Sequence, residues 1–80
     1  MNLFTEVINE LRQYSTCQIL EVSPLLKAAE INIQYDVFTL YTKGSDLWIG
    51  LYNQVGDVVN YRLNGKTADA IVDELYDRFG

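Results

Sequence analysis

Three stretches of alternating apolar and polar residues, each separated from the next by five residues, limit the folds open to this 80-residue chain. They run from Ile31 to Tyr41, from Leu47 to Tyr52 and from Val58 to Leu63. Period-two alternation is typical of β-strands, and connections this short join antiparallel neighbours. We therefore expect a three-stranded antiparallel meander. Its first strand is either buried on both faces at its end or changes register near Asp36.

Amphipathic helices are predicted at both ends of the chain. Apolar residues recur at helical spacing from Leu3 to Tyr14, and Asn2 precedes them as an N-cap. Thr67 is placed to cap a second helix that runs to about Arg78. The apolar stripe of this second helix is formed by Ala68, Ile71, Val72, Leu75, Tyr76 and Phe79.

The segment 15–30 decides how many strands the sheet has. Residues 17–22 have the composition of a short edge strand, which would be a fourth one. Ser23 and Pro24 read as an N-cap followed by proline at the first helical position, which predicts a short helix over 25–30. The alternative is a packed connector. The expected fold is a single α+β domain over residues 1–80, in the order α-(short α)-β-β-β-α.

The charge of the chain argues against two classes of partner. Eleven acidic residues against six basic ones give a formal net charge of −5, and the six bases are scattered singly. Binding to phosphate backbones or anionic membranes needs clustered Lys and Arg, so we expect neither nucleic acid nor membrane as a direct partner. No apolar run approaches the length of a membrane span, and the N-terminal segment has no basic signal-peptide region. We expect a cytoplasmic location, that of the host cell if the protein is viral.

The usual catalytic and metal-binding residue patterns are missing, so no enzyme activity, cofactor or metal is expected. The chain has no histidine, which removes the commonest general base and the commonest zinc ligand. Cys17 is the single cysteine and therefore has neither a disulfide partner nor a histidine to activate it. We interpret it as a small apolar core residue. The glycines fall singly, so no phosphate-binding loop is present.

A row of carboxylates on the C-terminal helix is the first candidate surface. Asp69, Asp73 and Asp77 stand at i, i+4 and i+8 and so share one helix face, which Glu74 broadens. Three interpretations apply: a solvated helix face, carboxylates that hold a cation or form a hydrolase pair, and a row of anions that contacts a basic partner.

The outer side of the predicted sheet is the second candidate surface. If Leu47 and Ile49 face the helices, then Trp48, Tyr52 and Arg62 face the other way. This composition is typical of interface hot spots, and Gly50 would leave a depression between the two aromatic side chains. The alternative is that the N-terminal helix covers this face and makes it part of the core.

These features favour a small, acidic, non-catalytic module that binds another protein with a basic surface. In size, acidity and lack of enzyme motifs the chain is similar to small phage-borne anti-defence proteins, including the anti-CRISPR group, although no motif is shared. That likeness implies an inhibitor of a nucleic-acid-handling complex. The alternative is a homodimer or other homo-oligomer that buries the face of Trp48 and Tyr52.

Overall fold

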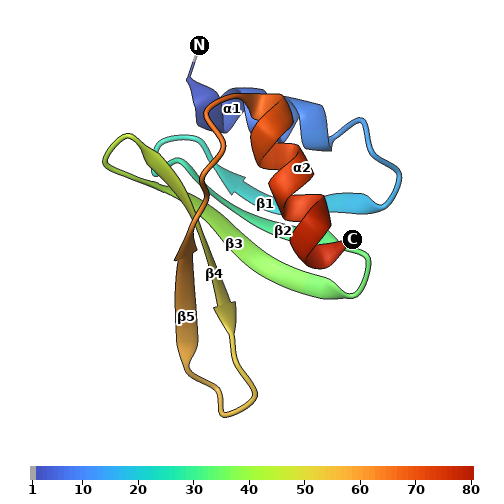
Figure 1. The fold of residues 1–80 in the computed structure, drawn as a ribbon, viewed down its shortest axis with the longest axis vertical. Coiled ribbons are helices and arrows are strands. Elements are labelled where there is room, and N and C mark those ends of the chain that lie inside the picture. Colours follow the sequence, from blue (N-terminus) through green and yellow to red (C-terminus); the bar gives the residue numbers. More distant parts are fainter. Residues whose placement is uncertain (1) are drawn as a thin grey trace.

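The computed structural model describes residues 2–80, which form one antiparallel sheet and two helices (Figure 1). The sheet is a meander in which each strand pairs with the next along the chain, in the order β1-β2-β3-β4-β5. The α+β class is confirmed, but the expected three or four strands are five. The elements are α1 (Leu3–Leu11), β1 (Cys17–Ser23), β2 (Ala28–Ile33), β3 (Asp36–Lys43), β4 (Asp46–Tyr52), β5 (Val58–Arg62) and α2 (Ala68–Phe79).

Both helices begin at the caps that the sequence predicts. The Asn2 side chain accepts a hydrogen bond from the Thr5 amide at 2.8 Å, and Thr67 Oγ1 accepts one from the Ala70 amide at 3.2 Å. The first helix ends at Leu11 and not at the predicted Tyr14. The Tyr14 ring instead leaves the helix and stacks on Tyr76 of α2 with ring centroids 4.9 Å apart.

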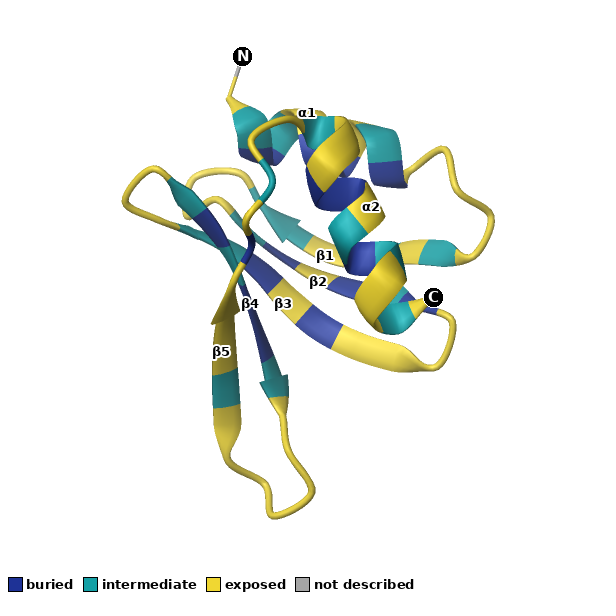
Figure 2. Ribbon diagram, viewed as in Figure 1, coloured by how far each residue is buried: buried dark blue, intermediate teal, exposed yellow. Residues whose placement is uncertain are grey.

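The helices pack side by side on one face of the sheet, where they form a single apolar core with the inward-facing strand residues (Figure 2). The fully enclosed strand residues alternate along β2, β3 and β4, as expected for a sheet with one covered face. The buried hydrophobic residues are Phe4, Val7, Ile8, Leu11, Ala29, Ile31, Ile33, Phe38, Leu40, Leu47, Ile49, Leu63, Ile71, Val72 and Leu75.

The predicted short helix over 25–30 is wrong, because residues 24–27 form the turn between β1 and β2 and residues 28–30 belong to β2. The Lys27 amide donates to the Pro24 carbonyl at 3.3 Å, and Lys27 has a left-handed φ of 51°. Leu25 and Leu26 are 93% and 75% exposed, so a helix here would have had no apolar face to bury. Two helical turns without packing are unstable, whereas Ala29 pairs with strands on both sides. The edge strand suggested over 17–22 is confirmed as β1.

The stretch from Ile31 to Tyr41 is two strands joined by a tight turn. Ile33 lies directly opposite Asp36, and Gln34 between them has a left-handed φ of 54°. Odd-numbered residues face the core before this turn and even-numbered residues face it afterwards. The change near Asp36 that the pattern suggested is therefore a reversal of the chain.

Candidate functional site

The sheet has one face without cover, because both helices lie on the other. Figures 1 and 2 show α1 and α2 together on one side, with the hairpin of β4 and β5 extending beyond them. Leu47 and Ile49 of β4 are buried in the core beneath the helices. Side chains alternate along a strand, so Trp48 and Tyr52 are on the side away from the helices. Within residues 2–80, the N-terminal helix does not cover this face, which resolves the question that the sequence left open.

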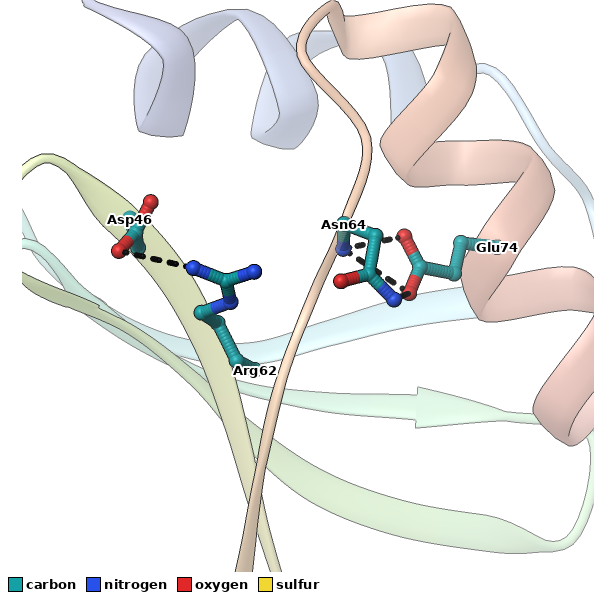
Figure 3. Close-up of polar contacts among 4 residues, drawn as sticks. All are labelled: Asp46, Arg62, Asn64 and Glu74. Atoms are coloured by element: carbon teal, nitrogen blue, oxygen red, sulfur yellow. Dashed lines mark hydrogen bonds and ion pairs between the residues drawn. The ribbon is translucent and has the colours of Figure 1, made fainter.

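Three residues form a row across the outer face. Tyr41 lies opposite Trp48, and Trp48 lies opposite Arg62 on the next strand. Two cations lie beside the indole. Lys43 Nζ is 5.1 Å from the ring centroid. Arg62, opposite Trp48 on β5, forms an ion pair with Asp46, with 3.7 Å between Nη1 and Oδ2 (Figure 3). The row therefore joins aromatic surface to positive charge, a combination that is enriched at protein interfaces.

A shallow hollow lies beside this row, above Gly50. The hydroxyl of Tyr41 donates to Asn60 Oδ1 at 2.7 Å, and a Cβ on Gly50 would come within 2.9 Å of the same oxygen. Glycine is therefore needed for these two side chains to meet. The hollow has a volume of about 240 Å³, and its lining includes Tyr52 and Val58, which are 75% and 54% exposed.

The helix layer carries an acidic surface that is larger than the sequence predicts. Asp69, Asp73 and Asp77 are exposed on α2, and Glu10 of α1 lies beside the first two. A hydrogen bond between the carboxyl groups of Glu10 and Asp69, together with partial burial and the negative charges of both aspartates, raises the pKa of Glu10 above its ordinary 4.5. Nothing in the sequence assigns Glu10 to this surface, because only the packing of α1 on α2 brings it there.

Replacing Glu10 by glutamine is expected to stabilise the protein at neutral pH. A carboxyl whose pKa is raised in the folded state weakens folding as the pH rises from about 4.5 through the folded pKa. We expect Glu10→Gln to melt a few degrees higher than the wild type at pH 7 and at the same temperature below pH 4. Thermal melts monitored by circular dichroism across this range test the sign. Glu6→Gln is the control, because Glu6 in the first turn of α1 stabilises the helix and its loss lowers the melting temperature.

Glu74 is on the same helix but faces the connection between β5 and α2 (Figure 3). Its carboxylate accepts hydrogen bonds from the Asn64 amide at 2.8 Å and from the Gly65 amide at 3.0 Å. The Asn64 side-chain amide also donates to it, at 3.5 Å. The structure thus separates Glu74, which ties the loop to the helix, from the three aspartates, whose side chains are exposed.

The two predicted surfaces are on opposite layers of the molecule. Trp48, Tyr52 and Arg62 lie on the sheet, whereas Asp69, Asp73 and Asp77 lie on α2 above the other face. Neither surface contains a metal-binding cluster: across residues 2–80 no three His, Cys, Asp or Glu side chains are grouped so that they could hold an ion. The helices in this part of the chain are too short and too polar to cross a membrane.

Comparison with known proteins gives no relative. No protein-family model, no curated protein and no solved structure matches the chain.

Proposed function

We propose that this protein is a non-catalytic binding module that docks on a basic surface of another protein, as an inhibitor of a nucleic-acid-handling complex would. The observation that carries the proposal is the open outer face of the sheet. A small domain gains stability by covering apolar surface, yet here both helices cover the same face and leave Trp48, Tyr41 and Tyr52 on the other. Aromatic residues and arginine so placed are the usual anchors of protein interfaces.

The expected charge of the partner follows from the helix layer. Glu10, Asp69 and Asp73 crowd together enough to raise the pKa of Glu10. Within the described part of the chain the one ion pair is that of Arg62 with Asp46, so these three carboxylates have no internal countercharge. A basic partner would supply it, and such an attraction accelerates association and weakens with salt.

Affinity capture from the native host tests the proposal, together with capture from the cells that the host infects if the gene is viral. We expect one partner to be retained by the wild type and lost with Trp48→Ala, because removing an interface anchor typically costs at least 2 kcal/mol, or about 30-fold in affinity. Asp73 is on the layer opposite to Trp48, so Asp73→Lys should act through the long-range attraction between the two proteins and weaken capture most at low salt.

Two matched controls separate these surfaces from general effects. Tyr35→Ala removes an aromatic ring that is 96% exposed at the turn between β2 and β3, away from the row. Glu21→Lys reverses a charge on β1, at the sheet edge opposite β5, three strands from Trp48 and away from the helix layer. Both should retain the partner. Capture that is unaffected by Trp48→Ala and by Asp73→Lys would show that neither surface binds it.

Homo-oligomerisation through the face of Trp48 and Tyr52 is the second candidate. The exposure of Tyr52 and Val58 next to the hollow favours it. In that case Trp48→Ala would convert the oligomer to a monomer in the absence of any other protein.

A further inference from the structure

Strand β5 is an edge strand with free backbone groups. It pairs with β4 alone, and the Leu63 amide donates to the Leu47 carbonyl at 2.8 Å. Antiparallel pairs use the backbone of every second residue, so Tyr61 and Val59 direct their amide and carbonyl groups toward β4. Val58, Asn60 and Arg62 alternate with them along the strand and direct their amide and carbonyl groups away from the sheet. A row of unpaired donors and acceptors therefore runs along this edge.

The opposite edge of the sheet is protected, whereas β5 is not. The pairing of β1 has a bulge between Ile19 and Glu21, which interrupts the regular ladder. The pairing of β5 is regular along its length, and Arg62 is the one charged residue of the strand. Exposed apolar residues also gather on the hairpin of β4 and β5: Tyr52, Val55, Val58 and Tyr61. This hairpin projects from the rest of the molecule (Figure 1), so another chain can approach its edge.

We propose that β5 pairs antiparallel with β5 of a second copy of this chain, around a twofold axis at Asn60. The two five-stranded sheets then become one continuous sheet of ten strands. The interface is at the strand edge and leaves the outer face over Trp48 open, so the inference stands apart from the proposed partner.

The register follows from which groups are free. Hydrogen bonds form only if the outward-facing residues of the two strands meet, and the arrangement centred on Asn60 is the one that pairs all five residues of each strand. It places Val58 opposite Arg62 of the second copy. An arrangement centred on Arg62 would set two guanidinium groups face to face, and it would pair fewer residues.

The same register is complementary on both faces of the new sheet. On the inner face Val59 lies opposite Tyr61 of the second copy, a β-branched and aromatic pair that stabilises antiparallel sheets. On the outer face the row of Trp48 and Arg62 continues into Val58 and Tyr52 of the second copy, since these two are themselves paired. The exposed apolar residues Val58 and Tyr61 thereby each gain a cross-strand neighbour from the second copy. Two short strands give a small interface, so the dimer should dissociate on dilution.

Sedimentation equilibrium over a roughly 100-fold range of protein concentration tests the dimer. We expect the wild type to approach 18.4 kDa, twice the 9.2 kDa of one chain, at high concentration. Asn60→Pro removes an outward amide without touching the pairing with β4, and should raise the dissociation constant at least about 100-fold. A wild type that stays at 9.2 kDa throughout would overturn the proposal.

Two controls separate edge pairing from other contacts. Asn60→Ala also loses the hydrogen bond from Tyr41 but keeps its backbone amide, so it should still form the dimer. Trp48→Ala should form it too, whereas it would not if the copies met through the outer face. A dimer that survives Asn60→Pro would contradict the proposed edge.

Hydrogen exchange on the wild type provides a readout that needs no variant. The amides of Val58, Asn60 and Arg62 should exchange slowly at high concentration and fast on dilution, while the Leu63 amide stays protected in both. Fast exchange of the first three at every concentration would exclude the pairing.

Discussion

Phe38→Ala is expected to lower the free energy of unfolding by about 4 kcal/mol, whereas Val37→Ala on the same strand should lower it by less than about 1 kcal/mol. The Phe38 side chain is 2% exposed and stacks on Phe79 of α2, with ring centroids 4.4 Å apart. Removing it leaves a cavity between the sheet and the helix layer. Val37 faces the other way and is 49% exposed, so its methyl groups are already in water.

Comparing the unfolding free energies of these two variants shows whether one face of the sheet or both faces are covered. A domain of this size has a total stability of roughly 5 kcal/mol, so Phe38→Ala should keep only about 1 kcal/mol at room temperature. Urea unfolding followed by circular dichroism gives both values. Similar losses for the two variants would mean that both faces of β3 are covered, in conflict with the two-layer arrangement.

Glu74→Ala should cost about 2–3 kcal/mol, because the Asn64 and Gly65 amides lose a charged acceptor. These bonds fix the chain where it passes from β5 to α2. Gly65 lies so close to the helix that a Cβ would come within 2.8 Å of the Ile71 nitrogen, so the loop has little room to find other partners.

Asp73→Ala is the matched control, one residue earlier on the same helix. Its side chain is exposed, and its removal relieves repulsion with Glu10, so the stability should be unchanged or slightly higher. Chemical denaturation of both variants under the same conditions makes the comparison. Equal losses would show that Glu74 is one more solvated carboxylate of the acidic row and has no structural role.

Local patterns in the sequence were sufficient to predict the helices and the last two strands. Asn2 and Thr67 cap as expected, because an N-cap satisfies backbone amides within its own turn and needs no distant contact. Strands β4 and β5 were predicted because Gly56 marks the turn between two alternating runs.

The turns that lack glycine were missed. Gln34 and Lys27 both adopt left-handed backbone conformations that glycine or asparagine usually takes, so neither hairpin could be recognised from its residues. Pro24 added to the error, since proline after serine is equally common at a helix start and in a tight turn. In both places pairing with neighbouring strands overrides the local preference.

The candidate surfaces were predicted in composition but not in their boundaries. That Trp48, Tyr52 and Arg62 share the face opposite to Leu47 and Ile49 followed from strand alternation, yet whether a helix covers that face depends on tertiary packing. The same packing adds Glu10 to the acidic surface and turns Glu74 toward the loop.

Fluorescence of Trp48, the single tryptophan of the chain, is the most direct test of the open face. In the free protein its emission should be red-shifted relative to that of a buried indole and should be quenched by acrylamide, because the indole is partly exposed on the outer face beside Lys43 and Arg62. Addition of a captured partner should shift the emission to the blue and remove the quenching. A free protein with blue-shifted emission that acrylamide does not quench would show that the outer face is covered and would contradict the proposed docking surface.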